Sequence, residues 1–196
     1  MTRGPGVLRT ARLYLEPVAD TDLDALQALN AEPAVRRYLF DDVAWTLEET
    51  RERLLVENAR MWREEGRGLL AIREQAGAPL AGWIGFWYFH EPPVLELAYA
   101  LHPRVWSRGY VMEAAGAVLA WAAQVHGDTT FQASTDAPNE ASIRVLERLG
   151  FQAVARTPGP VHETVHFARV GVPPVAPGPG EASGLRESSS GSRDPG

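Results

Sequence analysis

Hydrophobic and polar positions follow two different periods along the chain, and the period of each segment predicts its structure. Residues 8–17 alternate between apolar and polar as a strand does, and residues 20–31 have the spacing of a helix. Residues 46–65 predict a second helix, because Thr46 and Glu49 have the spacing of a capping box. The chain therefore begins with a strand and two helices.

The remaining segments alternate between strand and helix patterns, separated by turns rich in Gly and Pro. Gly150 is expected to end the last helix. The order predicts an α/β domain over residues 7–170, whose central antiparallel strands are followed by strand-helix-strand-helix-strand. We expect strands at 68–74, 80–89, 94–101, 130–135, 151–156 and 161–170, and helices at 109–125 and 140–149.

The carboxyl-terminal residues 171–196 are rich in Pro, Gly and Ser and contain little to bury, so we expect a disordered tail. An inert extension and a docking tail both stay open for this segment. Hydrophobic residues make up 45% of the chain and charged residues 22%, which is ordinary for one globular domain. Residues 1–6 are expected to fray.

Composition excludes several classes of function. The chain contains no cysteine, which rules out disulfides, thiolate zinc sites and cysteine nucleophiles. The net charge of -6 gives no field that would attract nucleic acid or an anionic membrane. The first ten residues lack the apolar core of a signal peptide, and no apolar run is long enough to span a membrane. We expect a cytoplasmic protein without nucleic-acid or membrane partners.

The turn before the helix at 109–125 is the first candidate for chemistry. Pro103 should end the preceding strand, and residues 104–109 form a short loop at the amino terminus of the helix. Free N–H groups and the helix dipole favour an anion at such a position. Gly109 allows close approach of the backbone, and Arg104 and Arg108 add positive charge. The loop has neither the Walker pattern nor the GxGxxG pattern.

Two motifs resemble the GNAT superfamily of N-acetyltransferases. The coenzyme A loop of that family runs Arg or Gln, two residues, Gly, one residue, Gly or Ala; here Arg104 and Gly109 match, and Ser107 replaces the first glycine. The stretch PNEASIRVLERLGF, at 138–151, resembles the family's Asn-x-x-Ser helix with its Leu-Gly-Phe end. Residues 8–170 are most similar to the branch of ribosomal-protein alanine and serine N-terminal acetyltransferases (RimJ/RimL-like).

The resemblance implies a mixed, mainly antiparallel twisted sheet with helices on both faces and splayed central strands. It implies acetyl-CoA as co-substrate and an amine as acceptor, either a protein amino terminus or a small molecule. The pantetheine arm would pair with the splayed strand, and the pyrophosphate would meet the loop amides. The implied coenzyme-binding residues are Leu97, Ala98, Tyr99, Leu101, Arg104, Trp106, Ser107, Arg108, Gly109, Tyr110, Asn139 and Ser142.

Catalysis by direct attack in a ternary complex needs a neutral amine, so a base is useful. Glu96, an isolated acid on an apolar strand, is the candidate base, against the alternative of a solvent-facing residue. Many relatives carry a tyrosine where this chain has Leu146, so Ser142 is the candidate donor to the departing thiolate. Tyr99 and Tyr110 could also donate.

The acceptor pocket is expected near four aromatic residues and one acid, which would suit a cationic amine. Four questions stay open: the physiological acceptor, the acyl chain, a homodimer, and a rival reading as a non-catalytic acyl-CoA sensor or interaction module. The candidate pocket residues are Tyr38, Phe40, Trp83, Trp87 and Glu163.

The run HETVH at 162–166 matches the HExxH expression of zinc proteases, which requires a helix. Its alternating pattern between two turns instead predicts a strand. Residues four apart on a strand lie about 13 Å apart, too far to share a metal with ligands about 2 Å away. We therefore expect no metal site from this motif.

Overall fold

The structure is a computed structural model that describes residues 6–90 and 92–170. The expected tail, at 171–196, lies outside the described residues. The helical segments are η1 (Asp20–Asp22), α1 (Leu23–Ala31), α2 (Pro33–Arg36), η2 (Phe40–Asp42), α3 (Leu47–Arg51), η3 (Glu52–Glu57), α4 (Asn58–Glu64), η4 (Pro103–Val105), α5 (Tyr110–His126) and α6 (Glu140–Arg148). The strands are β1 (Leu8–Arg9), β2 (Tyr14–Pro17), β3 (Leu69–Arg73), β4 (Gly82–Tyr88), β5 (Leu95–Leu101), β6 (Thr130–Asp136), β7 (Gln152–Pro158) and β8 (Glu163–Val170).

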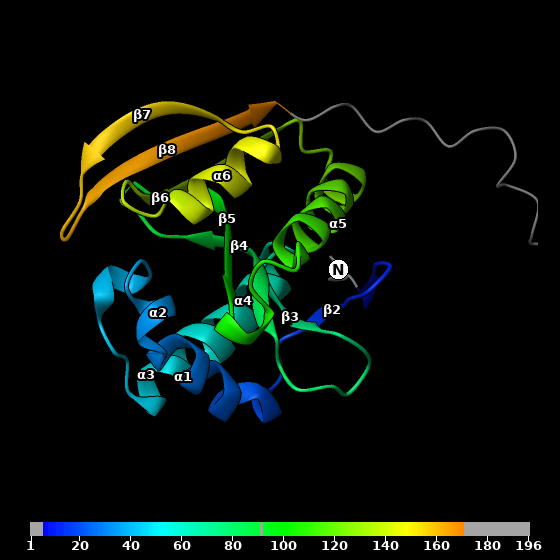
Figure 1. The fold of residues 1–196 in the computed structure, drawn as a ribbon. Coiled ribbons are helices and arrows are strands. Elements are labelled where there is room, and N and C mark those ends of the chain that lie inside the picture. Colours follow the sequence, from blue (N-terminus) through cyan, green and yellow to red (C-terminus); the bar gives the residue numbers. More distant parts are fainter. Residues whose placement is uncertain (1–5, 91, 171–196) are drawn as a thin grey trace, which may run out of the picture.

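The described strands form one eight-stranded sheet in the order β1-β2-β3-β4-β5-β6-β8-β7. Every neighbouring pair is antiparallel except β5 and β6, which are parallel. A parallel pair needs a crossover connection, and α5 provides it between these two strands (Figure 1). The expected mixed, mainly antiparallel sheet is confirmed.

Helices cover both faces of the sheet, as expected. Apolar residues of α5 and α6 pack with Leu97 and Leu101 of β5 in one core cluster. The helices α1 and α2 and the η3 segment pack in a second cluster with Ala98 and Ala100 of the same strand. Because successive strand residues point to opposite faces, β5 contributes to both cores. It is the central strand between the two helical layers in Figure 1.

The amino-terminal strand predicted at 8–17 is wrong in one respect, because it is a short hairpin of β1 and β2. The backbone N–H of Thr10 donates to the carbonyl of Leu13 at 3.0 Å, and the N–H of Leu13 donates to the Thr10 hydroxyl at 3.0 Å. These bonds fold the chain back where the alternation continued. Leu13 and Leu15 are buried all the same.

The other element boundaries follow the sequence closely. Thr46 and Glu49 make the predicted capping box. The segments α3, η3 and α4 follow one another without a break to Glu64. Gly150, with φ +85°, follows the end of α6. The HETVH run forms the start of β8, with His162 directly before the strand, so its prediction as a strand is confirmed. The helix α2 and the η2 turn were not predicted. Across the described residues, every helix is too short or too polar to cross a bilayer.

Candidate active site

The parallel strands β5 and β6 meet at one point and then separate. Their ladder has a single pair, Glu96 opposite Gln132, whereas β5 pairs with β4 along its full length. Past Glu96, the side of β5 that faces β6 therefore has backbone groups available to an extended ligand. A groove of about 1310 Å³ opens here.

The groove contains most of the residues expected to bind the coenzyme. Glu96 and Leu97 do not line it, and neither do Arg104 and Arg108. The expected residues that do line it are Ala98, Tyr99, Leu101, Trp106, Ser107, Gly109, Tyr110, Asn139 and Ser142.

The loop between β5 and α5 is built to expose backbone amides. Ser107 and Gly109 both lie in the left-handed region, with φ +61° and +76°. Ser107 therefore adopts the conformation that a glycine would adopt with less strain. In the described chain, the N–H groups of residues 107–112 donate no hydrogen bond to a protein acceptor. An anion at this helix terminus would meet several free donors.

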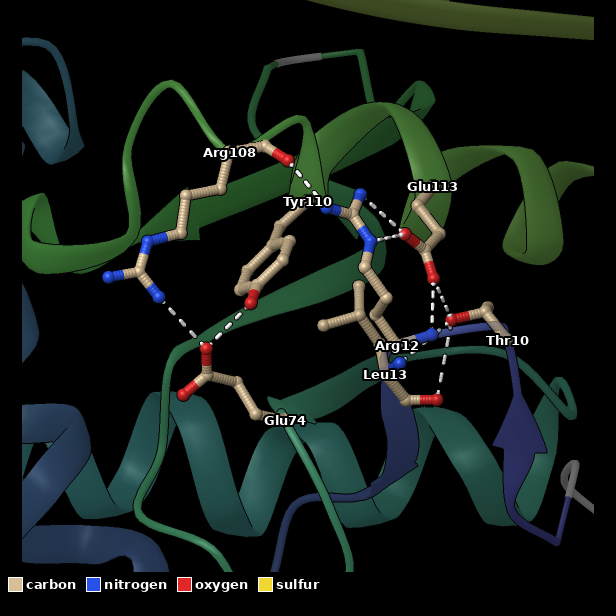
Figure 2. Close-up of polar contacts among 7 residues, drawn as sticks. All are labelled: Thr10, Arg12, Leu13, Glu74, Arg108, Tyr110 and Glu113. Carbon is tan, nitrogen blue, oxygen red and sulfur yellow. Dashed lines mark hydrogen bonds and ion pairs between the residues drawn. The ribbon is translucent and has the colours of Figure 1, made fainter.

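A polar network connects the loop and the start of α5 to the hairpin of β1 and β2 (Figure 2). The Arg12 guanidinium donates from Nη1 to the carbonyl of Arg108 at 2.9 Å and from Nε to Glu113 Oε2 at 2.7 Å. The Thr10 hydroxyl and the Arg12 backbone N–H donate to the other oxygen of Glu113. Burial acts to raise the pKa of Glu113, but the hydrogen bonds from Thr10 and Arg12 together lower it. The carboxylate thus ties the start of α5 to the hairpin of β1 and β2.

The two loop arginines do not point into the groove. Arg104 donates from Nη2 to the carbonyl of Leu80 at 2.6 Å, and Arg108 pairs with Glu74 at 3.1 Å. The Tyr110 hydroxyl also donates to Glu74, at 2.6 Å, and Figure 2 shows both groups converging on this carboxylate. The expectation that Arg104 flanks an anion therefore does not match this arrangement, in which the backbone is the exposed donor.

Glu96, the expected base, is buried with 3% of its surface exposed, so the solvent-facing alternative is wrong. The Ser134 hydroxyl of β6 donates to Glu96 Oε2. His90, from the loop between β4 and β5, lies with Nε2 3.0 Å from Ser134 Oγ and 3.6 Å from Glu96 Oε1. Ser134 and His90 were not predicted from the sequence, because nothing local to either residue indicates a carboxylate beside it.

Tyr99 and Ser142 meet across the gap that the separating strands leave. Their oxygens lie 2.8 Å apart, in a hydrogen bond that either hydroxyl can donate. Burial raises the pKa of Tyr99 to about 12, and the bond to Ser142 partly offsets this effect. Asn139 caps α6 by accepting from the Ser142 N–H at 3.2 Å. The Leu146 side chain, one turn farther along α6, is fully buried.

The far end of the groove is aromatic. Phe40 stacks on Trp45 with 3.7 Å between ring centroids, and Tyr38 and Trp87 also line the groove. Trp83 borders it too but is 1% exposed and donates to Asn30, so it is mainly a core residue.

Two acids, Asp41 and Asp136, line this end of the groove, and burial raises the pKa of Asp136. Glu163 was expected in the pocket, and this is wrong. The Glu163 side chain is exposed and pairs with Arg156. The next residue, Thr164, lines the groove instead. Adjacent residues of a strand face opposite sides, which explains the exchange.

His166 of the HETVH run lies beside His90 and Glu96, and one donor atom from each residue falls within 4.8 Å of the others. Ligands of a tetrahedral zinc ion would lie about 3.4 Å apart. All three side chains already bond to hydroxyls: Glu96 and His90 bond to Ser134, and His166 bonds to Thr157 at 2.8 Å. We therefore interpret the three residues as a hydrogen-bonded cluster.

The split sheet and the amide-lined loop define the class of protein: an α/β fold that can hold a long ligand with an anionic end. The family follows from sequence comparison, because residues 12–152 match the profile described as "Acetyltransferase (GNAT) domain". The chain belongs to this family and is an acyltransferase.

Individual proteins that resemble this chain are also acetyltransferases. The chain is 27% identical over 148 residues to the uncharacterized N-acetyltransferase YoaA of Bacillus subtilis (strain 168), covering 74% of this chain and 82% of the relative. A GNAT-family acetyltransferase from Bordetella pertussis has a TM-score of 0.75 at 24% identity, covering 85% of this chain and all of that one. RimL, a ribosomal L7/L12 alpha-N-protein acetyltransferase solved with coenzyme A, has a TM-score of 0.72 at 18% identity, with 85% and 98% covered.

Proposed function

We propose that this acyltransferase moves the acetyl group of acetyl-CoA to a primary amine by direct attack in a ternary complex. The observation that carries the proposal is the single pair between β5 and β6, Glu96 opposite Gln132. At that point the buried carboxylate of Glu96 lies on one face of β5. The hydroxyls of Tyr99 and Ser142 meet three residues farther along β5, on its other face.

The coenzyme fits the groove in two respects. The free edge of β5 past Glu96 can pair with the amide groups of a pantetheine arm, and the free N–H groups of residues 107–112 can receive its pyrophosphate. RimL, which shares the fold, is known with coenzyme A bound. When bound, acetyl-CoA supplies the acetyl group as a thioester.

Glu96 takes the proton that the amine must lose before it attacks. An α-amino group has a reference pKa of about 8 and a lysine about 10.4, so either arrives mostly protonated at neutral pH. Glu96 faces the side of the sheet where Ala98 and Ala100 pack, and the aromatic end of the groove lies on this side. The base is therefore on the acceptor side of β5.

Tyr99 and Ser142 donate a proton to the departing sulfur. One hydrogen bond joins the two hydroxyls, so one of their two protons stays free for the groove whichever residue donates. The raised pKa of Tyr99 keeps its hydroxyl protonated at neutral pH. Ser142 was the first candidate for this role and Tyr99 a further possible donor, and the bond between them makes the two hydroxyls a pair.

The acceptor is a primary amine with a positive charge before reaction. Asp41 and Asp136 would attract such a group, and the aromatic rings of Phe40 and Trp87 would contact its carbon skeleton. A protein amino terminus and a small-molecule amine both meet this description, and RimL is an example of the first kind.

The first experiment is isothermal titration of acetyl-CoA and of CoA into the purified chain. We expect micromolar binding at one site per chain. Turnover is then measured by CoA release with a panel of peptides with free amino termini, diamines and aminoglycosides. Binding without turnover on every amine would favour the rival reading as a non-catalytic sensor, and absence of binding would contradict the coenzyme site.

The role of the base is tested by Glu96→Gln, with Glu163→Gln as the matched control on an exposed strand position. Loss of a general base lowers turnover by about 100-fold or more. Glu96→Gln should show this loss with acetyl-CoA affinity unchanged, and Glu163→Gln should retain activity. Wild-type turnover in Glu96→Gln would contradict the assignment.

A further inference from the structure

Glu96 is isolated from the groove in which an amine would bind. Its carboxylate does not line the groove, whereas Ser134 and His90 both do, and both contact the carboxylate. An amine in the groove would therefore meet these two side chains before it met Glu96.

The hydrogen bonds among the three residues have one consistent direction. A hydroxyl has a single proton, and the Ser134 proton is donated to Glu96 Oε2. Ser134 Oγ must then accept from His90, whose Nε2 lies 3.0 Å away, so Nε2 carries the proton in this arrangement. The neutral imidazole of His90 consequently keeps a lone pair on Nδ1.

Two neighbouring aromatic rings surround the imidazole of His90. Its ring contacts the ring of His166 edge-on with 5.3 Å between centroids, and Phe89 lies 6.5 Å away. His166 is itself bonded to Thr157. Among the described residues, the titratable groups that face His90 are Glu96 from β5 and His166 from β8. The side chain of His90 is 35% exposed and lines the groove.

We propose that His90 and Ser134 carry the amine proton to Glu96, so that His90 is the group that contacts the substrate. His90 Nδ1 accepts a proton from the ammonium group, Nε2 gives its proton to Ser134 Oγ, and Ser134 gives its own to Glu96. The products are a neutral amine and a protonated carboxyl, and no other reactant is needed. This inference rests on the proposed function, since it supplies the route to the base.

The test uses His90→Gln, Ser134→Ala and Glu96→Gln in the full chain, with His126→Gln as the control at the far end of α5. His90→Gln and Ser134→Ala should each lower kcat by at least about tenfold, and the acetyl-CoA affinity of each should stay within twofold of wild type. The titration also shows that each variant is folded. His126→Gln should keep the wild-type rate, because its ring bonds to the Gly66 carbonyl and packs against Trp121, away from the groove.

Two readouts separate proton transfer from a structural role. The dependence of kcat on pH between 5 and 9 should change shape in His90→Gln, and added imidazole should restore part of the rate of His90→Ala, because the site opens to the groove. Wild-type kcat and pH dependence in His90→Gln, together with an inactive Glu96→Gln, would overturn the relay but leave the proposed function standing.

A third arm addresses a metal at the same cluster. Activity should be unchanged after treatment with EDTA. Loss of activity with EDTA and its return with Zn²⁺ would overturn the relay in favour of a metal centre at His90, Glu96 and His166. A wild-type chain that binds acetyl-CoA but acetylates nothing would contradict the proposed function itself.

Discussion

The left-handed backbone at Ser107 and Gly109 predicts opposite effects for two exchanges in the coenzyme loop. Ser107→Gly should stabilise the folded chain, and Gly109→Ala should destabilise it, because both positions have positive φ. Within the described part of the chain, a Cβ at Gly109 would approach only Arg12 Nη2, at 3.7 Å, which is an ordinary contact. The effect there is therefore conformational and not steric.

The magnitude follows from two opposing contributions. A side chain in the left-handed region costs about 1–2 kcal/mol relative to glycine. Glycine also gains about 0.4–1 kcal/mol of freedom in the unfolded chain, which opposes the benefit. The net change is about 0.5–1 kcal/mol at each position, with opposite signs. In a protein of this size it corresponds to a change in Tm of about 1–4 °C.

The assay is thermal unfolding by circular dichroism without ligand, followed by titration with acetyl-CoA. Ser107→Ala is the control, because it removes the hydroxyl but keeps the strained backbone, and its Tm should match wild type. Ser107→Gly should keep its acetyl-CoA affinity, since the amides supply the contacts. A Tm that falls in Ser107→Gly, or rises in Gly109→Ala, would refute the reasoning from φ.

Two further predictions concern the site and its support. Tyr99→Phe and Ser142→Ala should each lower kcat by less than about tenfold, because one hydroxyl remains to donate. The double variant should lower kcat by about 100-fold or more. If the product of the two single losses equals the loss in the double variant, the two hydroxyls act independently and the shared role is contradicted. Glu113→Gln should destabilise the chain at pH 7 by about 1–2 kcal/mol, because it removes charged hydrogen bonds to Thr10 and Arg12. The pKa of Glu113 is lowered in the folded state, so its contribution is complete above the unfolded pKa and is lost as the pH falls through the folded pKa. The Tm difference from wild type should therefore shrink toward pH 3, and a constant difference would contradict this account.

Local sequence was sufficient for most of the secondary structure. Alternation identified the HETVH run as a strand and not a zinc helix, and the residues that cap or end a helix, such as Thr46 and Gly150, act on backbone within one turn. Such features depend on neighbours a few residues away, so they can be read from a single sequence. The hairpin inside residues 8–17 was missed because its turn is held by Thr10 and Leu13 without Gly or Pro.

The arrangement of the site depended on the tertiary structure. The sequence indicated Glu96 and Ser142 and the amide-rich loop, together with the family that they resemble. It did not indicate that Ser134, 38 positions from Glu96, bonds to the carboxylate. It also gave no sign that the loop arginines turn toward Leu80 and Glu74 and away from the groove.

The physical reason lies in the range over which each property is decided. Helix ends and strand alternation are set by contacts along the chain, and the sequence by itself determined them. The separation of β5 from β6 and the burial of Glu96 depend on the register of strands joined through α5. A shift of one residue in that register would turn Glu96 or Ser134 to the opposite face, so only the packed sheet decides which side chains can exchange a proton.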